Sequence, residues 1–106
     1  METFTDSNFE SEVLSAPALT VVDLTAPWCG PCRMIAPFLT RLAEEYSGRV
    51  RFGKVDVDEN PGIPKRYEVK SIPTVLLFKQ GEVVERIQGA KTKGDYRTAI
   101  ERHLAA

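Results

Sequence analysis

The two cysteines of the chain, Cys29 and Cys32, stand three positions apart in the stretch Ala26-Pro27-Trp28-Cys29-Gly30-Pro31-Cys32. Thiol–disulfide exchange needs one thiolate that attacks and a second thiol close enough to resolve the mixed disulfide. A β-type run precedes this stretch and a helical pattern follows it, so Cys29 is expected at the N-terminal end of a helix. The free N–H groups and the dipole of that helix favour a thiolate. The spacing therefore predicts a redox dithiol in which Cys29 is the nucleophile and Cys32 the resolving thiol.

The two residues between the cysteines suit the same chemistry. Pro31 has no N–H to leave unsatisfied in a first helical turn, and it fixes the backbone between the two sulfurs. Gly30 lets a substrate approach without a side chain in the way. The alternative is half of a zinc site, but four ligands are needed and His103 is the only other soft candidate. No metal is therefore expected, and a zinc site shared between two chains is the strongest form of that alternative.

Composition limits the range of functions. The 106 residues are expected to form one domain spanning 1–106, a size that can bury a core without disulfide staples. With 14 Lys and Arg against 15 Asp and Glu the net charge is -1, which gives no basic surface for nucleic acid. No apolar run approaches the ~20 residues of a membrane span, so no membrane partner is expected. A monomer is the working expectation, although nothing in the sequence reports on oligomeric state.

The cysteine count and the acidic N-terminal residues 1–6 bear on location. This segment lacks the apolar stretch of a signal peptide, and two cysteines are too few for a secreted disulfide framework. A cytoplasmic protein is therefore expected, although a chain trimmed from a longer precursor would look the same.

The hydrophobic patterns predict which elements hold the dithiol. Ser7 and Glu10 have the form of a capping box for a short first helix, on which Phe9 and Val13 form an i, i+4 pair. Further along, strands are expected over 19–25, 50–57, 74–79 and 82–88, and helices over 31–48, 63–67 and 92–104. A βαβ unit followed by a ββα unit predicts an α/β fold with a central mixed sheet and helices on both faces, in three α/β/α layers.

The motif Trp28-Cys29-Gly30-Pro31-Cys32 resembles the active-site motif of the thioredoxin family, and the resemblance covers essentially the whole chain. Other positions that match the family pattern are Asp23, Pro37, Lys54, Ile72-Pro73-Thr74 and Gly89. The resemblance implies the thioredoxin fold, with four to five strands and four flanking helices. It also implies a protein disulfide reductase whose only redox group is the Cys29–Cys32 disulfide. Its partners would be disulfide-containing proteins and an electron donor similar to thioredoxin reductase.

Asp23 and Lys54 gain possible roles from the same resemblance. Asp23 is a carboxylate in a strand that is apolar on both faces, where burial would raise its pKa. The resemblance implies that it accepts the proton of Cys32, whereas most Asp side chains are simply exposed or hydrogen-bonded. Lys54 is similar to the lysine whose charge moderates that acid. A solvated strand lysine is the alternative reading.

A substrate groove is also implied by the resemblance. An Ile-Pro bond is cis in about 5–6% of cases, and the resemblance raises that expectation for Pro73 and places it beside the dithiol. The backbone of Ile72 would then pair with an extended substrate segment. The expected groove residues are Trp28, Gly30, Pro31, Ile72, Pro73 and Gly89.

Two alternatives and one departure stay open. An oxidant or isomerase of the same fold is disfavoured by Gly30-Pro31 and by the missing export signal, and a non-catalytic interaction subunit would tolerate loss of both cysteines. The departure is Leu24-Thr25-Ala26, where the family usually has Phe-Trp-Ala. Thr25 removes a large aromatic side chain from beside the motif, which puts local packing and the fit to a reductase in doubt.

Overall fold

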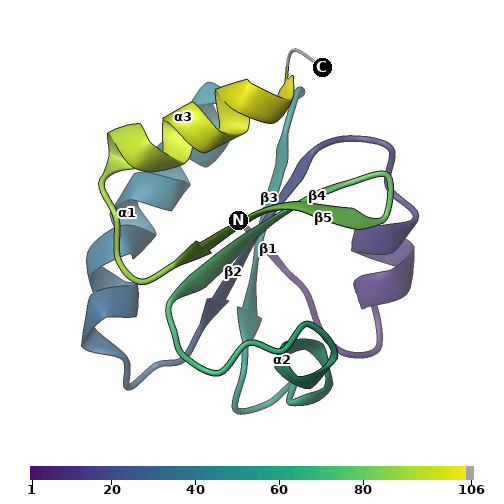
Figure 1. The fold of residues 1–106 in the computed structure, drawn as a ribbon, viewed down its shortest axis with the longest axis vertical. Helices are drawn as coiled ribbons and strands as arrows, with labels where there is room; N and C mark the ends of the chain where they lie inside the picture. The colour runs from purple at the N-terminus through teal and green to yellow at the C-terminus, as the bar shows by residue number, and fades with distance from the viewer. Residues whose placement is uncertain (105–106) are drawn as a thin grey trace.

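A five-stranded sheet runs through the middle of the molecule, with its strands in the order β1-β3-β2-β4-β5 (Figure 1). The computed structural model describes residues 1–104. The elements in chain order are β1 (Glu2–Thr3), η1 (Glu10–Leu14), β2 (Thr20–Thr25), α1 (Gly30–Glu45), β3 (Arg51–Asp56), α2 (Gly62–Arg66), β4 (Thr74–Lys79), β5 (Glu82–Gln88) and α3 (Lys93–Leu104). β1, β3 and β2 are mutually parallel, whereas β4 is antiparallel to both of its neighbours. The mixed sheet expected from the sequence is confirmed.

The helices cover both faces of this sheet, as the residue pattern predicts. Figure 1 shows α1 and α3 together on one side of the sheet, and the purple η1 segment and α2 on the other. Successive residues of β2 point to opposite faces, so Val21 packs under α1 while Val22 and Leu24 pack under η1 and α2. All three are buried, which confirms that β2 is covered on two faces.

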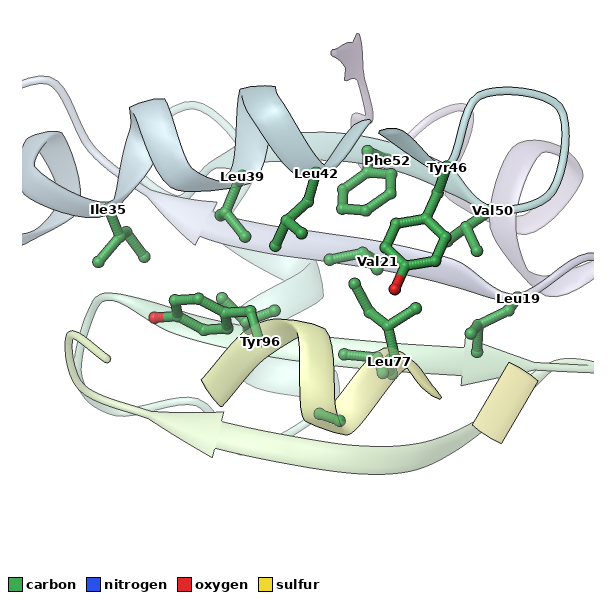
Figure 2. Close-up of a cluster of buried hydrophobic side chains, with 13 residues drawn as sticks. Leu19, Val21, Ile35, Leu39, Leu42, Tyr46, Val50, Phe52, Leu77 and Tyr96 are labelled. Atoms are coloured by element: carbon green, nitrogen blue, oxygen red, sulfur yellow. The ribbon is translucent and has the colours of Figure 1, made fainter. Parts of the chain in front are cut away.

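The larger core lies between the sheet and the pair α1 and α3. Figure 2 shows Ile35, Leu39 and Leu42 projecting from α1 toward the sheet, with Tyr96 of α3 among them. The α1 residues follow the helical spacing that the sequence displays, so one face of the helix is buried along its length. The helix ends at Glu45, before the predicted end at 48, and the turn that follows contains Gly48, whose φ of 85° is accessible to glycine at little cost.

The first helix differs from the expectation. η1 is a π-helical segment, and the predicted capping box of Ser7 and Glu10 does not form. The reciprocal bonds are made instead by Thr5 and Asn8: the Thr5 N–H donates to Asn8 Oδ1 over 2.7 Å, and the Asn8 N–H donates to Thr5 Oγ1 over 3.2 Å. The short Asn8 side chain hydrogen-bonds to the backbone of its own turn, so the turn starts at Thr5 and not at Ser7.

The turn between β4 and β5 and the start of α3 have the local structure predicted from the sequence. Gln80 and Gly81 have φ values of 52° and 82°, as a two-residue type I′ hairpin turn requires. The Thr92 N–H donates to Asp95 Oδ2 and the Asp95 N–H donates to Thr92 Oγ1, both over 3.1 Å. This reciprocal pair is the capping box that the sequence predicts at the start of α3.

A close approach between β3 and the N-terminal segment provides a test of the packing. A Cβ atom at Gly53 would overlap the ring of Phe4, which is completely buried. We expect Gly53→Ala to lower the free energy of unfolding by about 1 to 3 kcal/mol, because the ring has no free space to move into. Gly94→Ala is the matched control, since its Cβ would meet only the Thr92 hydroxyl at 3.8 Å. Urea unfolding measures both, and equal stabilities of the two variants would contradict this packing.

Candidate functional site

The two sulfurs lie at the connection between β2 and α1. Cys29 is the N-cap of α1, with an extended backbone (φ −86°, ψ 109°), and Pro31 occupies the first helical turn. Cys29 and Cys32 form a disulfide with their Cα atoms 5.3 Å apart. The Cys32 N–H, in the first turn of the helix, donates to Cys29 Sγ over 3.3 Å. The predicted position of Cys29 at the helix N-terminus is confirmed.

Asp23 is a buried carboxylate on the α1 side of the sheet. Its side chain belongs to a residue only 3% exposed, and its Oδ1 has no hydrogen-bond partner. Burial raises the pKa of Asp23 to about 7, and the positive charge of Lys54 acts in the opposite direction. The two residues are register partners in the parallel β2–β3 pair. Asp23 is therefore neither exposed nor paired, and it changes protonation near neutral pH.

Lys54 itself is exposed, as expected for a strand lysine that is solvated. Its charge still lowers the pKa of Asp23 below the value that burial alone would produce. The structure thus brings Lys54 next to Asp23 without burying its ammonium group, and the cost of desolvating a lysine is avoided.

Asp23 and Cys32 face one shared cavity of about 400 Å³ between α1 and the carboxyl ends of β2 and β3. Asp23, Thr25 and Lys54 reach it because alternate residues of a strand share one face of the sheet. The half-buried Thr25 forms part of its wall, at the position where the family pattern has a large aromatic residue. Asp23 and Cys32 therefore border the same space.

The segment around Pro73 closes the other side of the disulfide. The Ile72–Pro73 peptide bond is cis, as the resemblance implied. The carbonyl oxygen of Ile72 lies 3.9 Å from Cys29 Sγ, and Ile72 packs against the cluster formed by the two cysteines and Ala26. The Gly89 N–H donates to the Pro73 carbonyl over 2.9 Å, which holds Gly89 next to this segment. At both Gly30 and Gly89 the space that a Cβ would enter is open.

A second hollow, of about 550 Å³, begins at Trp28 and Ile72 and runs toward α2. Its other lining residues are Val57, Pro61, Pro64, Lys65, Val69, Lys70 and Ser71. We call it the α2 groove. Trp28 is 66% exposed, and its indole Nε1–H donates to Asp58 Oδ2 over 2.7 Å, which holds the ring at the edge of the groove. Apart from Trp28 and Ile72, none of these residues is predicted from the sequence, where 57–71 reads only as a turn and a weak helix.

The redox group of the site is the disulfide itself. Within residues 1–104, no three His, Cys, Asp or Glu side chains come together in a way that could hold a metal ion. The same part of the chain contains no helix with the length and apolar character needed to cross a membrane.

The burial of Asp23 predicts how stability depends on pH. In the unfolded chain Asp23 ionises at its ordinary pKa of 3.8, whereas in the fold it keeps its proton up to about pH 7. The folded state therefore holds more protons between these values, so the free energy of unfolding falls as pH rises through this window. We expect Asp23→Asn to raise the free energy of unfolding by roughly 2 to 4 kcal/mol more at about pH 8 than at about pH 4.

Urea unfolding at both pH values measures this difference. Glu59→Gln is the control, because Glu59 is exposed and its substitution should shift stability equally at the two pH values. A gain from Asp23→Asn that is the same at both pH values would show that Asp23 ionises normally in the fold.

The site's geometry agrees with comparisons to known proteins. A family model described as Thioredoxin matches residues 1–102. The chain is 44% identical to Thioredoxin 1 of Nostoc sp. over 100 residues, and 47% identical to Thioredoxin of Staphylococcus saprophyticus over 100 residues, in both cases covering 94% of each protein. It is 47% identical to the chloroplastic Thioredoxin M-type of Spinacia oleracea over 100 residues, which are 94% of this chain and 55% of that protein. The chain therefore belongs to the thioredoxin family, as a thiol–disulfide oxidoreductase whose redox group is the Cys29–Cys32 disulfide.

Proposed function

We propose that this protein is a general protein disulfide reductase in which Cys29 attacks the substrate. The observation that carries this proposal is the asymmetry of the two sulfurs. Both cysteines are buried, but Cys29 caps α1, receives a backbone N–H and adjoins the Ile72 segment, whereas Cys32 lies inside α1 and faces the cavity that holds Asp23. A sulfur in the first environment is stabilised as a thiolate, and a sulfur in the second can react only within the molecule.

The reaction then proceeds in two exchanges. The Cys29 thiolate attacks one sulfur of the substrate disulfide, a mixed disulfide forms, and the first substrate thiolate leaves. Cys32 gives its proton to Asp23 and attacks Cys29 Sγ, and the second substrate thiolate leaves. Two electrons have passed to the substrate, and the Cys29–Cys32 disulfide is restored on the protein.

Asp23 is suited to take the proton in the second exchange. A general base works best when its pKa lies near the operating pH, and burial brings that of Asp23 to about 7. Lys54 limits how far the pKa rises, so a useful fraction of the carboxyl groups is ionised at neutral pH. In this scheme Asp23 receives the proton of Cys32 and Lys54 lowers the pKa of Asp23. Neither residue touches the substrate.

The substrate would bind as an extended segment across the Ile72–Pro73 turn. Main-chain pairing with Ile72 recognises backbone shape more than side chains, which suits a protein that accepts many partners. Trp28, Gly30 and Pro31 would border this segment on one side, and Pro73 and Gly89 on the other. Substrates of this kind are flexible or unfolded disulfide-containing proteins.

An electron donor must reduce the disulfide again after each cycle. Proteins of this family are generally reduced by a thioredoxin reductase, and we assign a donor of that kind to this chain. We place the reaction in the cytoplasm, where thiols are kept reduced. Thr25 lies in the wall of the cavity close to the dithiol, so its small side chain would affect the fit to that donor.

The two cysteines can be tested separately in a turnover assay. With dithiothreitol as electron source, the protein should accelerate the reduction of insulin disulfides, and Cys29→Ser should abolish the acceleration. Cys32→Ser keeps the nucleophile but cannot resolve, so it should accumulate mixed disulfides through Cys29 that gel electrophoresis without reductant reveals. Full activity in Cys29→Ser would overturn the assignment of the nucleophile, and recovery of partners without mixed disulfides would favour a docking protein.

The direction of electron flow is tested by the reduction potential. Equilibration with glutathione should yield a value more negative than about −230 mV, because a reductant must lie below the potentials of glutaredoxins. Quantifying the oxidised fraction by thiol alkylation measures this directly. A value near about −120 mV would identify an oxidant instead.

A further inference from the structure

The α2 groove lies beside the proposed path of the substrate. Main-chain pairing with Ile72 would leave this groove unfilled. It shares Trp28 and Ile72 with the redox site, so a segment paired with Ile72 passes its mouth. Val57, Val69 and the two prolines make its floor apolar, and each of these prolines and valines keeps some exposed surface. A substrate side chain that enters the groove therefore buries apolar area that main-chain pairing does not use.

Two positive charges stand on the rim of this apolar floor. Lys65, in the last turn of α2, and Lys70, just before the Ile72 turn, are both exposed. Neither ammonium group has an ion pair or hydrogen bond with another residue among those the structure describes. By contrast, Arg51 is paired with Glu2 and Glu12 at the far edge of the sheet. The charge of Lys65 and Lys70 is thus available to a bound segment.

The acidic residues of the same region lie outside the lining of the groove. The described residues that line it include Lys65 and Lys70 and no carboxylate. Asp58 lies at the Trp28 end, where its Oδ2 accepts the indole N–H of Trp28 and keeps its negative charge. The lining itself therefore presents an apolar floor and two positive charges.

Resting on the reductase function proposed above, we propose that Lys65 and Lys70 make the α2 groove a subsite for substrate segments that carry an apolar and an acidic side chain on one flank of the reactive disulfide. The apolar side chain occupies the floor, and the carboxylate meets the two ammonium groups on the rim. Both lysines are specificity-determining residues and take no part in the sulfur chemistry.

The expected size of the effect follows from the exposure of the lysines. Exposed ion pairs contribute little, so each lysine should change the rate for an acidic peptide by at most about fivefold. Two lysines acting together should favour an acidic over a lysine-containing peptide by about tenfold at low ionic strength. The preference should shrink strongly at about 0.5 M salt, where the screening length is only a few ångströms.

Matched disulfide peptides test this selectivity. The peptides share one apolar residue and differ only in carrying two Glu, two Gln or two Lys residues, placed on either flank of the reactive disulfide. The pre-reduced protein is mixed with an excess of each peptide, and the second-order rate constant of this single turnover is obtained from the release of peptide thiols. We expect the order Glu, Gln, Lys on one flank, and the reverse order for Lys65→Glu/Lys70→Glu.

A second double variant controls for net charge. Arg41→Glu/Arg49→Glu changes the charge of the protein by the same amount, but at exposed positions in α1 and in the turn that follows it. It should keep the preference of the unmodified protein for the acidic peptide. Equal rates for the Glu and Lys peptides, or a preference that survives in Lys65→Glu/Lys70→Glu, would overturn the subsite. So would an equal loss of preference in the arginine variant.

Hydroxyethyl disulfide separates this inference from the function on which it rests. This small neutral molecule cannot reach the groove and the sulfur at once, so the lysine and arginine double variants should both reduce it at the rate of the unmodified protein. If the unmodified protein reduces neither it nor the peptides, the reductase function fails and the subsite fails with it. If it reduces all of them without discrimination, the reductase function stands and only the subsite is lost.

Discussion

The burial of β2 on both faces is the constraint from which the chemistry of this protein follows. A strand covered by α1 and α3 on one side and by η1 and α2 on the other has no solvated face on which to place a charge. Asp23 nevertheless occupies this strand, with one carboxylate oxygen unpartnered and Lys54 beside it on the neighbouring strand. A carboxyl group in this position titrates near neutral pH because desolvation opposes its charge and only one nearby cation supports it.

The same strand also positions the sulfurs. β2 runs directly into the turn before α1, so the end of the strand and the N-terminus of the helix meet within the stretch that contains Cys29. The helix places Cys32 one turn further in, over the carboxyl ends of β2 and β3, where it shares a cavity with Asp23. One buried strand thus carries Asp23 and leads into the helix that carries Cys32.

Two hollows lie beside the disulfide. On the α1 side, the cavity is lined by Cys32, Asp23 and Thr25, and our proposal assigns it to the proton of Cys32. The α2 groove begins at Trp28 and Ile72, and our proposal assigns it to the substrate. Because the two hollows share no lining residue, the proposal implies that substitutions on the rim of the groove leave the surroundings of Asp23 unchanged.

Features that depend on neighbours in the chain could be predicted from the residues alone. The spacing of Cys29 and Cys32, the burial of one face of α1, the hairpin at Gln80-Gly81 and the capping box of Thr92 and Asp95 follow from local backbone and side-chain preferences, and the structure has them as expected. The prediction from local residues was wrong at the start of the first helix, where the pairs Ser7/Glu10 and Thr5/Asn8 could each form the cap and the second pair does.

Contacts between distant segments could not be predicted in this way, because they arise when the chain packs into its fold. It left Oδ1 of Asp23 without a hydrogen-bond partner, set Ile72 next to Cys29 across 43 positions of the chain, and joined Trp28 to the stretch 57–72 in the α2 groove. Whether a side chain loses its water, and which residues it touches, depends on which surfaces pack together. Packing brings together residues from distant parts of the chain, and no periodic pattern in the sequence marks such pairs.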